Sequence, residues 1–164
     1  MTYKLPPETM DASRRLEANA GEGSTQSHPV RYPGHPHRRA LRVLIVDDEE
    51  ELADSLCTTI TSWGHSTHRL YDGASGLIAA GDQAPNVVLL DIAMPGMDGY
   101  EFARQLRLRT ELQGCYLIAM RSTDDVRGGA RRESTIDLFL AKPMNLSVLE
   151  TLLLMEGERL DRLS

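Results

Sequence analysis

The chain has 164 residues, of which 41% are apolar and 26% charged, a balance typical of one globular domain with an extension. The net charge of −6 is uneven: residues 1–40 carry six Lys/Arg and four Asp/Glu, whereas residues 41–164 carry twelve and twenty. An acidic domain lacks the basic face that direct nucleic-acid binding normally needs, so we expect no nucleic-acid partner.

Neither a membrane span nor a signal peptide is expected, because no apolar run is long enough for the first or placed for the second. The two cysteines, Cys57 and Cys115, match no metal or redox spacing and are interpreted as reduced thiols. We therefore expect a cytoplasmic protein.

Residues 1–40 are rich in Pro, Gly, Ser and His and show no sustained period, which predicts a flexible tail or linker. His28, His35 and His37 could suggest a metal site there. A solvated polar tail is the favoured interpretation, because no cysteine or acidic ligand accompanies these histidines.

From Leu41 onward, short apolar runs alternate with segments of helical spacing. Strands are expected over 41–46, 65–71, 86–90, 115–120 and 136–141, and helices over 52–63, 74–81, 100–106, 123–133 and 146–160. This alternation predicts an α/β domain at 41–156, a parallel sheet covered on both faces, with 157–164 as a helix end or tail.

Charged residues stand where three of these strands end. Asp47 and Asp48 follow the first strand, Asp91 the third, and Lys142 the fifth. Because ligands of open α/β sheets bind beyond the carboxyl ends of the strands, these side chains should converge. Three clustered carboxylates favour a hard divalent cation such as Mg²⁺, and Lys142 could hold an anionic oxygen. Each acid taken alone could instead cap the helix that follows it.

The stretches LIVDDEE, VVLLDIAMPGMDGYEFARQLR and FLAKP resemble the receiver domain of two-component response regulators. The resemblance implies a doubly wound, flavodoxin-like fold, a five-stranded parallel sheet of order 2-1-3-4-5. It implies that Asp91 is the phosphoacceptor, that Mg²⁺ is held by Asp47, Asp48, Asp91 and the backbone carbonyl of Ala93, and that Lys142 binds a phosphoryl oxygen. It also implies a cis Lys142–Pro143 bond. Phosphoryl transfer needs in-line placement and neutralised charge, which this set can supply.

One position departs from the family, which carries Ser or Thr at the end of the fourth strand. Counting forward from Asp91 gives Arg121, and counting back from Lys142 gives Met120; Ser122 or Thr123 could substitute only if the loop shifts. Arg121 could fork onto the phosphoryl oxygens, or it could point to solvent and leave conformation weakly coupled to phosphorylation. The second alternative is slightly favoured.

The aromatic switch position of the family falls on Phe139, which has no hydroxyl and could equally be a core strand residue. Ser134 and Thr135 replace the small Ala-Gly pair of the family, at the face where its partners usually dock.

These observations predict a phosphoacceptor receiver protein of a phosphorelay, with no DNA-binding or enzymatic output domain of its own. The expected partners are a histidine kinase or histidine phosphotransfer protein and a downstream protein on the fourth and fifth strand/helix face, with a homodimer left open. One alternative is a degenerate receiver that docks partners independently of phosphorylation. An aspartyl-phosphate phosphohydrolase is disfavoured, because Ala93 stands where such enzymes need a second acid. We expect no enzyme activity beyond the protein's own phosphorylation and dephosphorylation.

Overall fold

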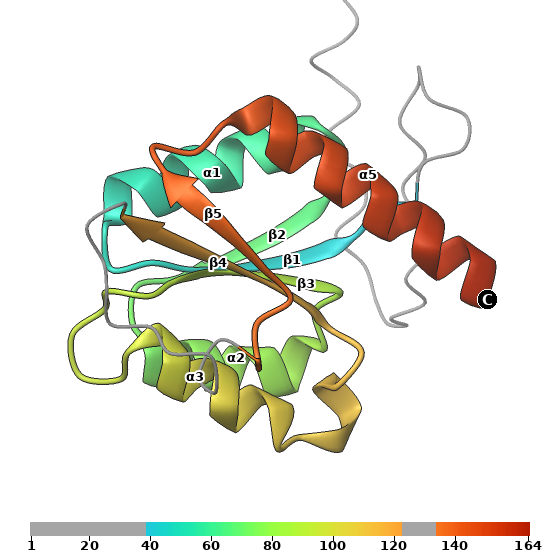
Figure 1. Cartoon of the computed structure of the whole chain (residues 1–164). Coiled ribbons are helices and arrows are strands. Elements are labelled where there is room, and N and C mark those ends of the chain that lie inside the picture. Colours follow the sequence, from blue (N-terminus) through green and yellow to red (C-terminus); the bar gives the residue numbers. More distant parts are fainter. Residues whose placement is uncertain (1–38, 123–133) are drawn as a thin grey trace, which may run out of the picture.

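The computed structural model describes residues 39–122 and 134–164, which are coloured in Figure 1. Almost all of the expected tail, its three histidines and the expected helix at 123–133 lie outside these residues.

Five strands form one parallel sheet in the order β2-β1-β3-β4-β5. They are β1 (Arg42–Val46), β2 (Ser66–Leu70), β3 (Val87–Asp91), β4 (Tyr116–Ser122) and β5 (Leu138–Lys142). The order reverses between β1 and β3, which is the switch point at which doubly wound sheets bind ligands. The predicted fold class and strand order are confirmed.

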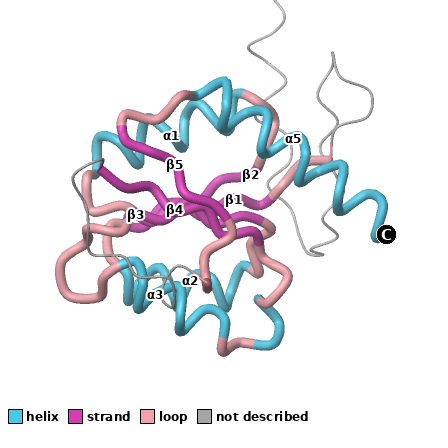
Figure 2. The backbone as a smooth tube through the Cα atoms, in the orientation of Figure 1, coloured by secondary structure: helices cyan, strands magenta, loops and turns pink. Residues whose placement is uncertain are grey.

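Helices cover both faces of the sheet (Figures 1 and 2). On one face lie α1 (Glu50–Ser62) and α5 (Leu146–Leu163); on the other lie α2 (Gly73–Gln83) and α3 (Gly99–Arg107), followed by the short 3₁₀ helix η1 (Thr110–Leu112). Within the described ranges no helix is both long and apolar enough to cross a membrane.

Local signals set the ends of these helices. The side chains of Asp72, Asp98 and Asn145 accept backbone N–H groups in the first turns of α2, α3 and α5. Gly64, which comes just after α1, adopts a φ of 94°, a conformation that a glycine takes without strain.

Strand alternation divides the core into two apolar clusters. Leu44 and Val46 of β1 pack in the cluster beneath α2 and α3, whereas Val43 and Ile45 pack in the cluster beneath α1 and α5. Because successive side chains of a strand point to opposite faces, this alternation also fixes the side of the sheet that each terminal residue faces.

Strand β4 begins one residue later and ends two residues later than its apolar run predicted. Arg121 pairs with Ala141, and Ser122 pairs with Lys142, so backbone pairing with β5 continues after the last apolar residue, Met120. Arg121 is half-buried and Ser122 exposed, and polar residues are therefore tolerated at this end of the strand.

Candidate functional site

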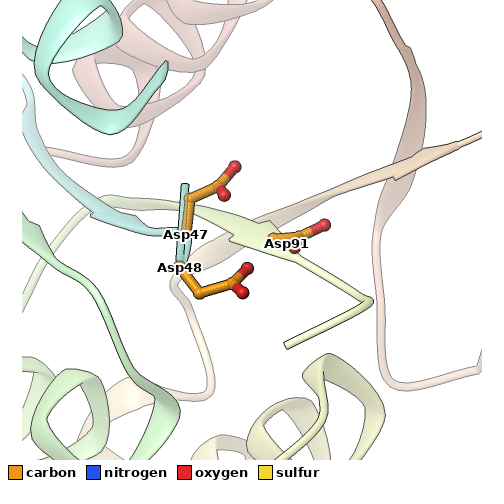
Figure 3. Close-up of side chains that lie close together, drawn as sticks. All are labelled: Asp47, Asp48 and Asp91. Carbon is orange, nitrogen blue, oxygen red and sulfur yellow. The ribbon is translucent and has the colours of Figure 1, made fainter. Parts of the chain in front are cut away.

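Three carboxylates meet at the carboxyl edge of the sheet (Figure 3). Asp47 and Asp48 directly follow β1, and Asp91 is the last residue of β3 on the neighbouring strand. One oxygen from each carboxylate lies within 4.8 Å of the others. The structure thus brings together the three acids that the sequence analysis placed at a metal site.

Lys142 is the last residue of β5, which lies two positions from β3 in the sheet, and its side chain reaches the same cluster. Its Nζ atom lies 2.8 Å from Oδ2 of Asp47 and 3.2 Å from Oδ1 of Asp91. The Asp47 side chain has no exposed surface, and that of Asp91 is 6% exposed. The Lys142–Pro143 peptide bond is cis, as the sequence analysis expected.

The cluster carries an excess of negative charge. Burial raises the pKa of Asp47, although hydrogen bonds from Lys142 and from the Glu49 backbone oppose this effect. The pKa of Asp48 is also raised, first by partial desolvation and then by the nearby Asp91. Burial acts to lower the pKa of Lys142, but its bonds to Asp47 and the charges of Asp47 and Asp91 outweigh burial and raise it. Lys142 therefore stays charged beside acids that it only partly compensates.

This donor set fits a hard divalent cation, because it offers clustered carboxylate oxygens with surplus negative charge. Capping of α1 does not explain the cluster, because the N-cap residue is Glu49 and its side chain makes no cap hydrogen bond. Oδ1 of Asp47 accepts the Glu49 N–H at 3.0 Å, yet its other oxygen is turned to Lys142. Asp48 is exposed, which is the position expected of a metal-binding carboxylate on the solvent side of the cluster.

The loop from Ile92 to Asp98 connects the site to α3 through a turn. Gly96 has a φ of 73°, and Asp98 caps α3 by accepting the Glu101 N–H at 2.8 Å. Ala93 is exposed in this loop, and the metal-binding role expected for its carbonyl stays a prediction.

Arg121 stacks on an aromatic ring, and the two roles considered for it from the sequence stay predictions. Its guanidinium carbon lies 4.5 Å from the ring centroid of Phe139, which packs against the cluster beneath α2 and α3. Lys142 lies on the opposite face, because Leu138 and Leu140 of the same strand pack in the cluster beneath α1 and α5. The stacked pair thus lies across the sheet from the acids.

Counting along the chain did not select Ser122, which lies on β4 and which the strand register places beside Lys142. Met120 is the β4 partner of Asp91 and is buried in the cluster beneath α1 and α5. Alternation places Ser122 on that same face, and Ser122 pairs with Lys142. The useful signal is therefore the face of the sheet to which each β4 residue points, and not the number of residues that separate it from Asp91 or Lys142.

Comparison with known proteins agrees with this geometry. A family model described as "Response regulator receiver domain" matches residues 43–154. The transcriptional regulatory protein AfsQ1 of Streptomyces coelicolor is 31% identical over 120 residues, 71% of this chain and 52% of that protein. The DNA-binding response regulator MtrA of Mycobacterium tuberculosis is 36% identical over 102 residues, 62% of this chain and 44% of that protein.

Solved structures share the fold. The receiver domain of Francisella response regulator 1452 superposes with a TM-score of 0.64 at 22% identity, covering 73% of this chain and 98% of that one. A CheY-like receiver domain protein from Methanospirillum hungatei gives 0.66 at 21% identity, covering 74% and 97%.

The expectation that nucleic acid is no partner is wrong for this group of proteins. AfsQ1 and MtrA are named as transcriptional and DNA-binding regulators, and this chain spans about half the length of each. The acidic balance of residues 41–164 describes the receiver alone. It carries no information about the other half of such proteins, so it could not support the exclusion.

Proposed function

This chain belongs to the response regulator receiver domain family of two-component systems, and we propose that Asp91 is its phosphoacceptor. The observation that carries the proposal is the position of Lys142, whose Nζ contacts both Asp47 and Asp91. One oxygen of Asp48 lies within 4.8 Å of an oxygen of each of these two carboxylates. A lysine held by two clustered acids is a ready partner for an anion that forms on one of them.

In the proposed reaction a carboxylate oxygen of Asp91 attacks the phosphorus of the donor. A new oxygen–phosphorus bond forms, the bond to the donor breaks, and the donor group leaves with the bonding electrons. With acetyl phosphate the leaving group is acetate, so no proton has to move. The remaining work is alignment and neutralisation of charge on the phosphoryl oxygens.

Each site residue has a separate role in this alignment and charge neutralisation. Asp47, Asp48, Asp91 and the Ala93 carbonyl would hold Mg²⁺, which when bound supplies positive charge to the phosphoryl oxygens. Lys142 exchanges its contact with Asp91 for one with a phosphoryl oxygen. Ser122, on the same face, donates its hydroxyl hydrogen to another oxygen of the group.

The stacking of Arg121 on Phe139 supports a second candidate, a receiver that docks partners without regard to phosphorylation. A cation–π pair on the opposite face from the acids would leave Arg121 away from the phosphoryl group. Affinity for a captured partner, measured with and without beryllofluoride and Mg²⁺, separates the two candidates. Equal affinities favour docking independent of phosphorylation.

Incubation with acetyl phosphate and Mg²⁺ followed by intact-protein mass measurement tests the phosphoacceptor proposal. The wild-type chain should gain about 80 Da, the mass of one phosphoryl unit. Asp91→Asn should gain none, and chelation of the metal should stop the gain. A wild-type chain that stays unmodified under these conditions would refute the proposal.

A further inference from the structure

The first turn of α3 packs directly against the backbone of Asp91, and a glycine makes this contact. A Cβ atom on Gly99 would lie 2.5 Å from the carbonyl oxygen of Asp91 and 2.8 Å from Cα of Ile92. Both are backbone atoms, so no side-chain rotation could relieve the overlap. Any residue other than glycine would displace either α3 or the peptide that carries the Asp91 carboxylate.

A hydrogen bond closes the loop at the same point. The Gly99 N–H donates to the Ile92 carbonyl at 3.1 Å, so the chain leaves the site at Ile92 and returns to it at Gly99. The Asp98 cap fixes the first turn of α3 beside this contact. The position of the Asp91 peptide, and with it the 3.2 Å contact between Asp91 and Lys142, therefore depends on how closely α3 approaches.

We propose that Gly99 is a positioning residue for phosphoryl transfer: it lets α3 set the place of the Asp91 carboxylate opposite Lys142 and Asp47. The inference rests on the proposed phosphoacceptor function. Gly99 touches no reacting atom and acts only through the backbone of Asp91.

Gly73, in the first turn of α2, packs against the same loop (Ile92 to Asp98) at Met97. A Cβ atom there would lie 3.0 Å from both Cβ and the carbonyl oxygen of Met97. This approach is less severe and is farther along the chain from Asp91, so Gly73 should position the loop more weakly than Gly99 does.

Gly76 provides a matched control from the core. A Cβ atom on Gly76 would lie 2.9 Å from Cγ2 of Val46 and 3.1 Å from the ring of Phe102, which are buried side chains and not the loop. Gly76→Ala should therefore destabilise the fold without moving Asp91. Comparing Gly99→Ala with Gly76→Ala separates an effect on positioning from a loss of stability. A loss of stability alone would reduce the amount of folded protein but not the rate of each folded molecule.

The experiment measures the limiting rate of phosphorylation by acetyl phosphate in Mg²⁺, per folded molecule, for wild type, Gly99→Ala and Gly76→Ala. Gly99→Ala should lower this rate ten- to hundredfold, on the order of the effect of misplacing a reacting group by an ångström. Gly76→Ala should lower the melting temperature and leave the rate within about twofold of wild type, because its added Cβ would overlap side chains and not the backbone of Asp91.

An unchanged rate in Gly99→Ala, or equal losses in the two variants, would overturn the proposal. If Gly99→Ala does not fold, Gly73→Ala takes its place with an expected severalfold loss, and a wild-type rate there would overturn it as well. A wild-type chain that takes up no phosphate shows instead that the phosphoacceptor function has failed, and the positioning role fails with it.

Discussion

Lys142 and Asp47 form an ion pair, half-buried at the lysine and buried at the carboxylate, that joins the two strand ends farthest apart in the site. Their Nζ and Oδ2 atoms lie 2.8 Å apart, and the carboxylate has no exposed surface. The two residues are 95 positions apart in the chain. The pair therefore forms only when β1 and β5 are both in place.

Replacing Lys142 by Met should destabilise the protein in the absence of a metal. The change leaves Asp47 buried without its cation, which costs about 3 kcal/mol of unfolding free energy for a pair of this burial. Urea unfolding in EDTA measures the loss, and added Mg²⁺ should restore part of it. Lys142→Arg, which keeps the charge, is the control and should lose less. A Met variant as stable as wild type in EDTA would show that the pair contributes nothing.

The raised pKa of Asp47 predicts an unusual dependence of stability on pH. A carboxyl whose pKa is higher in the folded state contributes stability below its ordinary value of about 3.9 and loses it as the pH rises through the folded value. Without metal, Asp47→Asn should therefore be more stable than wild type at about pH 7. The difference should shrink toward about pH 4.

Asp72 supplies a control of opposite sign for that measurement. The backbone N–H of Ser75 lowers the pKa of Asp72, so this carboxylate contributes stability above the ordinary value and loses it as the pH falls. Asp72→Asn should be less stable than wild type at neutral pH, again with a difference that shrinks in acid. Denaturant unfolding across this range would contradict the assignment if both variants shifted in the same direction.

Removing the Ser122 hydroxyl should slow phosphorylation. Loss of one hydrogen bond to a charged phosphoryl oxygen costs about 1.5 kcal/mol, or roughly tenfold in rate. Ser122→Thr keeps the hydroxyl and should stay near wild type. The initial rate with acetyl phosphate and Mg²⁺ gives the comparison. Equal rates for Ser122→Ala and wild type would remove Ser122 from the site.

Arg121→Ala should leave that rate within about twofold of wild type, because the guanidinium stacks on the opposite face of the sheet. It should lose at least about 0.5–1 kcal/mol of stability, the usual size of a cation–π contact at a partly exposed site. Phe139→Leu should lose a similar amount. A tenfold change in rate for Arg121→Ala would instead place its side chain at the phosphoryl group.

The acids and the lysine of the site could be located from the sequence because each follows a run of apolar strand residues. The carboxyl end of a buried strand is marked in the sequence by the change from apolar to charged residues. Parallel strands bring their carboxyl ends to the same edge of the sheet. Asp47, Asp48, Asp91 and Lys142 were placed together on this basis.

The register of β4 could not be obtained in the same way. Counting from Asp91 and from Lys142 gave Arg121 and Met120, and a shift of one residue moves a side chain to the other face of the sheet. Only the pairing of Met120 with Asp91 and of Ser122 with Lys142 resolves this choice. The contact between Gly99 and the Asp91 carbonyl was hidden for a similar reason, because a close backbone approach leaves no trace in the sequence beyond the glycine itself.

Borohydride trapping tests the central claim most directly. An aspartyl phosphate is an acyl phosphate, which borohydride reduces to the alcohol of homoserine, so peptide mass mapping after treatment with acetyl phosphate and Mg²⁺ locates the modified residue. We predict homoserine at position 91 and at no other aspartate, with Asp48 as the neighbouring internal control. Homoserine at Asp47 or Asp48, or an unmodified Asp91 in a protein that has gained phosphate, would contradict the assignment.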